Sequence, residues 1–296
     1  METKQNDHIA LLLMGLTVAM WGFSWIAMKS LVPYIGPFDL VMWRYALAFV
    51  ALLVVLLVTR QPLKCPPFML TLGIAVFQTT AFQCLCQLAL VTGGAGHVVM
   101  LAYTMPFWVA LFAWPLLGER PTRRHVLGFI CAGVGLIAII APWQGLGSLT
   151  GSLLALLGGV SWGLGAVLSK IMFQRHAPKV LTLTMWQMAL GTLLTFPVTL
   201  IFPQQEMILS PELFWGLAYT AIGASALGWW LWMSVVRRVS ATVAGMSSLG
   251  VPVLTVLLAW LFLSEQPSTA ELFGVAFIMM GLVIVNLEGS RGSARP

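Results

Sequence analysis

The chain has 296 residues, of which 59% are hydrophobic and only 8% are charged. A soluble domain carries about 25% charged residues, and the 15 basic and 9 acidic side chains here are too few to cover a globule of this size. The composition therefore argues against a soluble enzyme. It also excludes intrinsic disorder, which requires few apolar residues and many charges. It indicates a polytopic membrane protein.

Apolar runs long enough to span a membrane follow one another along the chain. A helix needs about 20 apolar residues to cross the hydrocarbon core, and such runs cover residues 9–30, 38–58, 68–90, 96–117, 124–141, 151–171, 180–202, 212–235, 242–263 and 271–288. A membrane barrel would instead alternate polar and apolar residues. The first run exceeds the core of a signal peptide and no A-x-A-like cleavage site follows it, so we expect it to be retained. The sequence thus predicts an all-α protein with ten transmembrane helices.

The basic residues predict the orientation of these helices, because Lys and Arg gather in short cytoplasmic loops. With the N-terminus inside, the outer loops hold no basic residue, and the cytoplasmic side holds Lys4, Arg60, Lys64, Arg120, Arg123, Arg124, Arg175, Lys179, Arg237, Arg238, Arg291 and Arg295. Lys29, Arg44 and Lys170 fall within the spans. We therefore expect both termini in the cytoplasm. Because the basic residues form short loop clusters and not a face of a folded domain, we expect no nucleic-acid partner.

The second half of the chain repeats the first. Residues 106–136 align without gaps on residues 252–282, and ten of the 31 positions are identical, including the Glu-x-Pro turns at 119–121 and 265–267. Further matches are Trp21 with Trp162, Lys29 with Lys170, and Met42-Trp43 with Met185-Trp186, which sets Arg44 opposite Gln187. Because five helices per half is an odd number, the halves enter the membrane from opposite sides, as in many secondary transporters. We expect a first repeat over 1–141, an outer linker over 142–150, a second inverted repeat over 151–288, and a cytoplasmic tail over 289–296.

The repeat carries a resemblance to a known family. The two five-helix halves, the Trp-Gly pairs at 21–22 and 162–163, and the turns Gly-Glu-Arg-Pro (118–121) and Ser-Glu-Gln-Pro (264–267) resemble the EamA branch of the drug/metabolite transporter superfamily. Residues 90–96 and 103–108 are similar, more narrowly, to bacterial amino-acid exporters of the cystine/cysteine type. The resemblance implies a multi-pass protein of the bacterial inner (plasma) membrane that exports small metabolites. It also implies a central cavity lined mainly by helices 1, 3, 4, 6, 8 and 9.

Three basic residues lie at membrane depth and require a partner. An unpaired Arg there costs about 2.5–3.5 kcal/mol or more, so a carboxylate, a water-filled cavity or a substrate anion must offset the burial of Arg44. Either Arg44 snorkels outward or pairs with Asp39, or it docks a substrate carboxylate. Lys29 and Lys170, which the repeat relates, either snorkel or attract anionic groups at opposite mouths of the protein.

Polar and aromatic side chains on several spans complete the candidate substrate site. Thr80, Gln83, Cys84 and Gln87 are spaced to share one helix face, which either bonds to other helices or lines the cavity. Aromatic rings offer flat apolar contact and cation–π attraction to an ammonium group, although packing or a position at the membrane interface explains many of the 13 Trp. The predicted substrate-binding residues are Trp21, Trp25, Lys29, Arg44, Thr80, Gln83, Gln87, Tyr103, Trp162, Lys170, Trp229, Trp230 and Ser247.

A proline occupies the same place in each half. Pro106 and Pro252 are predicted near the centres of their helices, where a proline removes a backbone hydrogen bond and clashes with the preceding turn. The freed carbonyls, those of Ala102 and Ser248, must find protein, water or ligand. Each proline either sets a static kink or acts as a hinge that bends during transport.

These patterns together predict an inner-membrane secondary transporter. The resemblance implies that it exports small amphiphilic metabolites, most of all amino acids such as cysteine, cystine or aromatic amino acids, and the inverted repeat predicts alternating access. The alternatives are an intramembrane lipid-modifying enzyme, or a channel or scaffold. The chain has no H-E-x-x-H, no Walker A sequence and no cluster of catalytic groups at membrane depth, so we expect that it is not an enzyme.

The expected partners follow from this function. They are a small-molecule substrate and the lipid bilayer, while a monomer and a homodimer both remain open. We expect no cofactor and no metal site, since no C-x-x-C pair exists among the four cysteines. The spans hold no mid-membrane carboxylate, which argues against tight proton coupling and leaves facilitated diffusion or exchange.

Overall fold

The structure is a computed structural model that describes residues 2–92, 95–140, 149–263 and 269–292. Every regular element in these residues is a helix and none is a strand, which confirms the predicted all-α class. In chain order the elements are α1 (Glu2–Leu31), α2 (Pro37–Val58), α3 (Phe68–Ile74), the π-helix η1 (Ala75–Ala81), α4 (Phe82–Thr92), α5 (Ala95–Ala102), α6 (Met105–Leu117), α7 (Arg123–Ile140), α8 (Leu149–His176), α9 (Val180–Ile201), α10 (Pro211–Ala218), the π-helix η3 (Tyr219–Leu227), α11 (Gly228–Arg238), α12 (Ala241–Ser247), α13 (Gly250–Leu263) and α14 (Thr269–Gly292).

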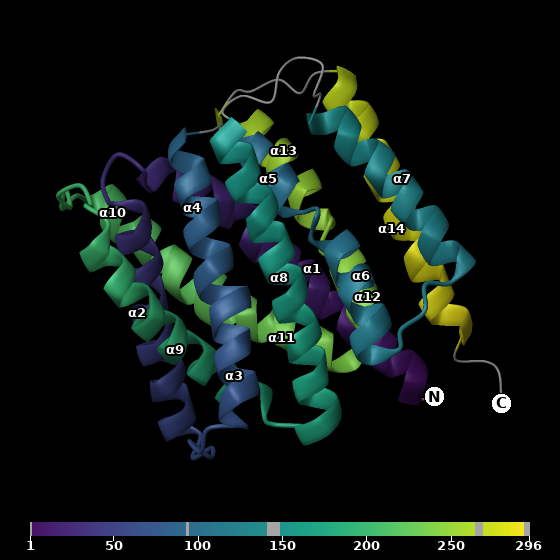
Figure 1. Ribbon diagram of the computed structural model, residues 1–296, viewed down its shortest axis with the longest axis horizontal. Coiled ribbons are helices and arrows are strands. Elements are labelled where there is room, and N and C mark those ends of the chain that lie inside the picture. Colours follow the sequence, from purple (N-terminus) through teal and green to yellow (C-terminus); the bar gives the residue numbers. More distant parts are fainter. Residues whose placement is uncertain (1, 93–94, 141–148, 264–268, 293–296) are drawn as a thin grey trace.

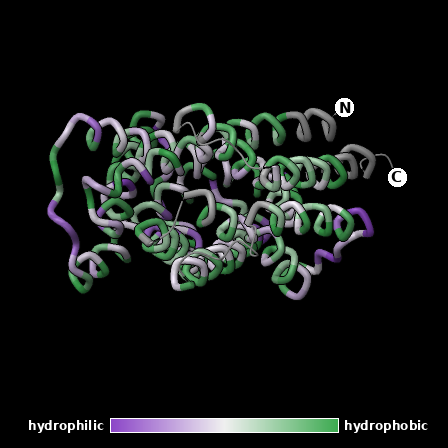
Figure 2. Tube along the Cα trace, turned by 90° about the horizontal axis from the view of Figure 1, so that it is seen from above, coloured by the Kyte–Doolittle hydropathy of each residue, from purple (hydrophilic) through white to green (hydrophobic). Residues whose placement is uncertain are grey.

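The helices run side by side in one bundle, with the start of α1 and the end of α14 on the same side (Figure 1). Most helical turns are hydrophobic, and prominent hydrophilic stretches lie on connections at its edges (Figure 2). Within the described residues, seven helical segments are long and apolar enough to cross a membrane: Ile9–Leu31, Pro37–Val58, Phe68–Val91, Val98–Leu117, Leu149–His176, Val180–Ile201 and Ala241–Leu258. The other three predicted spans correspond to α7, to the run from α10 to α11, and to α14, so the count of ten stays a prediction.

Helices of each half pack against the other half. The first helices do so symmetrically, because α1 contacts α11 and α13 while α8 contacts α4 and α6. The second helices follow the same rule, since α2 contacts η3 and α9 contacts η1. Residues in the middle of α1 and α8 are therefore enclosed by helices of both halves.

The internal repeat extends to the interruptions of the helices. A shift of 146 residues, the offset of the sequence alignment, moves the bounds of α4 onto 228–238, which are the bounds of α11. The same shift places η1 inside the range of η3, and α6 on α13 with a difference of one residue at the start. In each half a π segment therefore precedes the second part of the third predicted helix. A π turn bonds residue i to i+5 and changes the direction of the side chains that follow it.

The two prolines lie at helix starts and not at helix centres, which corrects the predicted position. α5 ends at Ala102 and α6 begins at Met105, so Pro106 is the second residue of a new helix. α13 begins at Gly250, and Pro252 is its third residue. At the first turn of a helix the missing N–H has no intrahelical partner to lose. In each half one helix therefore ends before the proline and a new helix begins. The sequence had instead predicted one continuous helix with a bend at the proline.

Glycines related by the repeat bring α7 and α14 into close contact. A Cβ atom on Gly135 would lie 2.5 Å from the carbonyl oxygen of Gly274, and one on Gly281 would lie 2.7 Å from that of Gly128. In the sequence alignment Gly128 matches Gly274 and Gly135 matches Gly281, so the crossing has the symmetry of the repeat. Small residues of this kind allow membrane helices to approach closely.

The close crossing predicts that Gly135→Ala lowers the melting temperature. Its methyl group would meet the backbone of α14, including the Ile278 nitrogen at 2.9 Å, and overpacking of this kind costs about 1–3 kcal/mol. Gly133→Ala is the matched control on the same helix, because its nearest neighbour would be the Phe107 ring at 3.7 Å. Thermal unfolding in detergent, followed by size-exclusion chromatography, compares the two. Equal melting temperatures for both variants would contradict the crossing.

Candidate functional site

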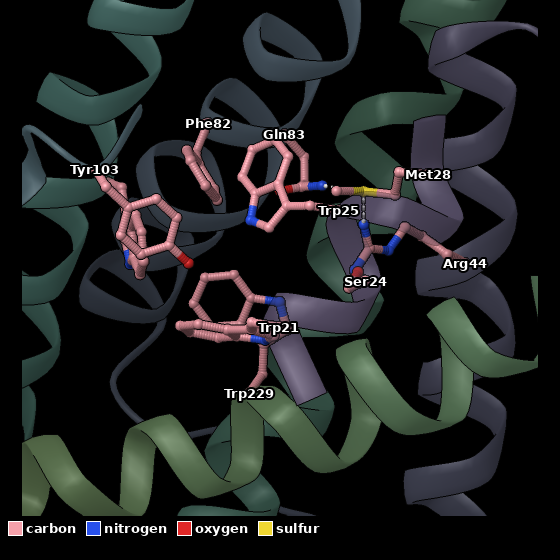
Figure 3. Close-up of a pocket in the computed structure, with 10 residues that line it drawn as sticks. Trp21, Ser24, Trp25, Met28, Arg44, Phe82, Gln83, Tyr103 and Trp229 are labelled. Atoms are coloured by element: carbon pink, nitrogen blue, oxygen red, sulfur yellow. Dashed lines mark hydrogen bonds between the residues drawn. The ribbon is translucent and has the colours of Figure 1, made fainter. Parts of the chain in front are cut away.

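A small cavity lies where the two halves meet. Its lining residues are Trp21, Ser24, Trp25, Met28, Arg44, Phe82, Gln83, Tyr103, Trp162 and Trp229, and Figure 3 shows them converging from several helices. None of the ten is more than 6% exposed. The volume of about 20 Å³ has room for roughly one water molecule. The first half supplies eight of these residues and the second half supplies two, one from α8 and one from α11.

Aromatic rings form most of the cavity wall. Trp21 and Trp162, which occupy the same repeat position, meet edge to face with ring centroids 5.4 Å apart. Phe82 and Tyr103 pack on Trp162 at 4.8 and 5.2 Å, and Trp229 packs on Trp21 at 5.0 Å. Nε1 of Trp21 donates to the carbonyl oxygen of Ala224 at 3.0 Å, whereas Nε1 of Trp162 has no partner among the described residues. The wall therefore offers apolar ring faces and one unused N–H donor.

Arg44 brings a positive charge to the edge of the cavity. Its side chain is buried, and Nε donates to Oγ of Ser225 at 2.8 Å. Nη1 lies 2.9 Å from Sδ of Met28 (Figure 3). The ring of Tyr45 lies 5.5 Å from the guanidinium carbon. None of these partners carries a negative charge, and a thioether is a weak acceptor. Burial excludes snorkelling, and the contacts go to η3 and α1 instead of to Asp39.

The π segment η3 holds the hydroxyl that meets Arg44. Ser225 donates its own hydrogen at 2.8 Å to the carbonyl oxygen of Thr220, five residues earlier, which leaves its lone pairs for the guanidinium. Met28 also accepts a weak contact from Nε2 of Gln83 at 3.4 Å. One sulfur atom thus links α1, α2 and α4 at the cavity.

The structure brings seven of the thirteen predicted residues into the lining: Trp21, Trp25, Arg44, Gln83, Tyr103, Trp162 and Trp229. Sequence reasoning missed Ser24, Met28 and Phe82. Helical spacing could have found the first two, because they follow Trp21 by three and seven residues and so share its face. Phe82 is one of many apolar residues in an apolar span and carries no comparable signal.

Lys29 and Lys170 lie outside the cavity and cap the ends of helices. Nζ of Lys29 donates at 3.1 Å to the carbonyl oxygen of Leu90, near the end of α4. Nζ of Lys170 donates to those of Val236 and Val239 at 3.1 and 2.6 Å, at the end of α11. A shift of 146 residues moves position 90 onto 236, so the two contacts are related by the repeat. Cations at these positions satisfy carbonyls that a helix C-terminus leaves unpaired.

The remaining predicted residues are also placed elsewhere. Thr80 lies in η1, whose wider turn breaks the spacing that would put it beside Gln83. Gln87 is buried but does not line the cavity. Trp230 lines a separate groove between α2, α9 and α11, and Ser247 ends α12.

The lining differs in two respects from the set of helices that the resemblance implied. It comes from predicted helices 1, 2, 3, 4, 6 and 8, so that Arg44 adds helix 2 and helix 9 contributes no lining residue. Among the described residues, no group of three His, Cys, Asp or Glu side chains is placed to hold a metal ion. The site is built from six aromatic rings, one guanidinium and the side chains of Ser24, Met28 and Gln83.

Comparison with known proteins gives the class. The EamA-like transporter family matches the chain twice, over residues 8–141 and 149–287. "Uncharacterized transporter YoaV" of Bacillus subtilis is 26% identical over 283 residues, which are 92% of this chain and 94% of the relative. The "Probable amino-acid metabolite efflux pump" of Salmonella typhimurium is 28% identical over 304 residues, covering 98% and 97%. A solved crystal structure with 21% identity shares the fold, with a TM-score of 0.79 over 96% of this chain and 99% of that chain.

The family match and the relatives show that this helical membrane bundle is a transporter and not an enzyme. It belongs to the EamA-like transporter family, which lies in the drug/metabolite transporter superfamily. The two family matches confirm that the chain holds two repeats. The outer linker over 142–150 lies mostly outside the described residues, and the predicted domain boundaries stay predictions.

Proposed function

We propose that the chain is a secondary transporter of the bacterial inner membrane that exports small amphiphilic metabolites, above all amino acids. The observation that carries this proposal is Arg44, a buried guanidinium at the edge of an aromatic cavity whose described partners are all uncharged. A charge at membrane depth is costly and marks substrate pathways. A substrate carboxylate would offset that cost, because guanidinium and carboxylate form paired, charge-assisted hydrogen bonds.

The rest of the cavity suits the other end of such a substrate. Rings of Trp21, Trp25 and Tyr103 offer faces that attract an ammonium group, and apolar area that packs against a hydrophobic side chain. None of the ten lining residues is acidic. A zwitterionic amino acid with an apolar, sulfur-containing or aromatic side chain combines these requirements. The name of the Salmonella relative supports the amino-acid class, and cysteine, cystine and aromatic amino acids are the candidates.

We further propose that transport proceeds by alternating access between two inverted halves of five helices each. The cavity is enclosed by buried side chains and has a volume of only about 20 Å³. This supports an occluded conformation. A substrate would reach the cavity only when one half moves against the other. A channel would need a continuous path, so the small cavity favours a carrier. The lining holds no Asp, Glu or His, which favours facilitated diffusion or exchange over a proton relay within the cavity.

The central prediction concerns Arg44→Gln, which removes the charge and leaves a polar side chain. A hydrogen-bonded charged group contributes about 1.5–3 kcal/mol, so we expect substrate affinity to fall by roughly tenfold to a hundredfold and counterflow of amino acids in proteoliposomes to be lost. Arg44→Lys should restore part of it, because Lys keeps the charge but lacks the planar fork. Arg175→Gln, an exposed position outside the cavity, is the control. Normal counterflow by Arg44→Gln would refute the site, and failure of both Arg44 variants to fold would make the residue structural.

The proposed orientation has a direct chemical test. In a cysteine-free protein, a single Cys at position 206 should react in intact cells with a membrane-impermeant maleimide. Single Cys residues at positions 64 and 123 should react only after the membrane is permeabilised. Labelling of position 64 or 123 from outside would overturn the cytoplasmic placement of both termini.

The hinge function of Pro106 and Pro252 is also a proposal. Alanine restores an N–H that allows α5 to join α6 and α12 to join α13, and so stiffens both breaks. We expect Pro106→Ala with Pro252→Ala to fold, to bind substrate within a few-fold of the unmodified protein, and to transport slowly. Binding is measured by equilibrium titration and transport by vesicle flux. Full transport by the double variant would leave the breaks as static features.

A further inference from the structure

A second, larger hollow lies on the side of the bundle, away from the aromatic cavity. We call it the basic groove; it is lined by Ala51, Leu52, Val55, Thr59, Gln61, Lys179, Val180, Leu181, Ile222, Ala226, Leu227, Trp230, Ser234, Arg237 and Arg238. Its volume is about 900 Å³, at the upper end of the range for ligand pockets, roughly 300–1,000 Å³. The groove lies between α2, α9 and the run from η3 to α11, which neighbour one another in the bundle.

One end of the groove is positively charged. Lys179 precedes α9, and Arg237 and Arg238 end α11, so three cations gather at one end of neighbouring helices. All three are exposed. The contact that the structure shows for the Arg238 guanidinium is Nη1 donating to the carbonyl oxygen of Ser234 at 2.8 Å. No acidic residue lines the groove, and its charge is therefore complementary to an anion.

The rest of the groove is apolar and opens to the side of the bundle. Val55, Ile222 and Leu227 are 44%, 50% and 44% exposed, and in a membrane such side chains face lipid. The positions from Ala51 to Thr59 span about 12 Å of helix, and those from Ile222 to Arg238 span about 24 Å. Half of the hydrocarbon core measures about 15 Å. The α2 side of the groove thus spans slightly less than one leaflet, and the side formed by η3 and α11 is long enough to reach past the middle of the bilayer.

The repeat shows that this charge is a feature of one half. A shift of 146 residues relates Arg237 and Arg238 to Val91 and Thr92, neither of which is charged. The match of Met42-Trp43 with Met185-Trp186 gives the second helices an offset of 143 residues, and under this offset Lys179 corresponds to Gly36. A pseudo-symmetric groove would therefore lack the cations, so the basic end is confined to one leaflet.

We propose that the basic groove binds one anionic phospholipid. Its phosphate lies between Lys179, Arg237 and Arg238, and an acyl chain lies along Val55, Ile222 and Leu227. Basic pockets between transmembrane helices bind anionic headgroups in this way. The lipid rests against η3, and so contacts the π segment whose Ser225 accepts a hydrogen bond from Arg44 at the edge of the aromatic cavity.

The test is native mass spectrometry of the full chain, released from detergent after equilibration with equal amounts of phosphatidylglycerol and phosphatidylcholine. One basic side chain near an anionic lipid contributes roughly a fivefold preference, so three predict at least a tenfold excess of bound phosphatidylglycerol. The triple variant Lys179→Gln, Arg237→Gln, Arg238→Gln should reduce that preference to about one. The matched control is Arg123→Gln, Arg124→Gln, Arg175→Gln, which removes the same charge from exposed positions outside the groove and should keep the preference.

A second variant tests the apolar part of the groove. Ile222→Trp places a bulky ring on the proposed path of the acyl chain while keeping all three cations, and it should lower the amount of both lipids that stays bound. Equal binding of the two lipids by the unmodified protein would overturn the proposal. An equal loss of the phosphatidylglycerol preference in the control variant would also overturn it, as would full retention of lipid by Ile222→Trp. Displacement of the lipid by an amino-acid substrate would assign the groove to the transport path instead.

Discussion

The burial of one guanidinium organises the centre of this protein. Arg44 is buried away from bulk water, so protein or ligand must meet most of its charge, and the protein meets it with a hydroxyl, a thioether and a ring face. The hydroxyl comes from a π segment of the opposite half, and the thioether from the helix that carries two of the cavity tryptophans. Cross-packing of the halves is therefore what allows Arg44 to be buried at all. The same packing leaves its charge without a counter-charge among the described residues, which is the basis of the proposed carboxylate site.

Pseudo-two-fold symmetry explains most of what surrounds that charge. Trp21 and Trp162 are equivalent positions and touch each other, so the symmetry relation passes through the cavity itself. Gln83 and Trp229 are equivalent under the 146-residue shift and both line it. Lys29 and Lys170 are equivalent and cap equivalent helix ends. The repeat thus makes the same structural contact once in each half, and the cavity lies where equivalent residues of the two halves meet.

Much of this could be predicted from the sequence, and the exceptions have physical causes. Apolar runs predicted the helices because a bilayer imposes their length, and the position of Arg44 within such a run marked it as exceptional. The π segment η1 could not be predicted, since residues 75–81 contain neither Pro nor Gly, and Thr80, which lies in it, does not line the cavity. The helix breaks before Pro106 and Pro252 depend on turns that sequence periodicity does not resolve. Lys170 looked like a functional charge because the carbonyls that it caps belong to a helix far away in the sequence.

The two halves differ in charge at the repeat position that holds Arg44. Arg44 and Gln187 occupy the same repeat position, and each reaches into the π segment of the other half, Arg44 to Ser225 and Gln187 to Oε1 of Gln78 at 3.4 Å. Two identical halves that exchange conformations would make the inward-open and outward-open states equal in energy. A charge in one half and a neutral amide in the other would remove that degeneracy, because the guanidinium would meet a different environment in each of the two proposed states. Under the proposed alternating-access mechanism, the empty carrier would therefore have a preferred resting side, and a substrate carboxylate that neutralised Arg44 would bring the two states closer in energy.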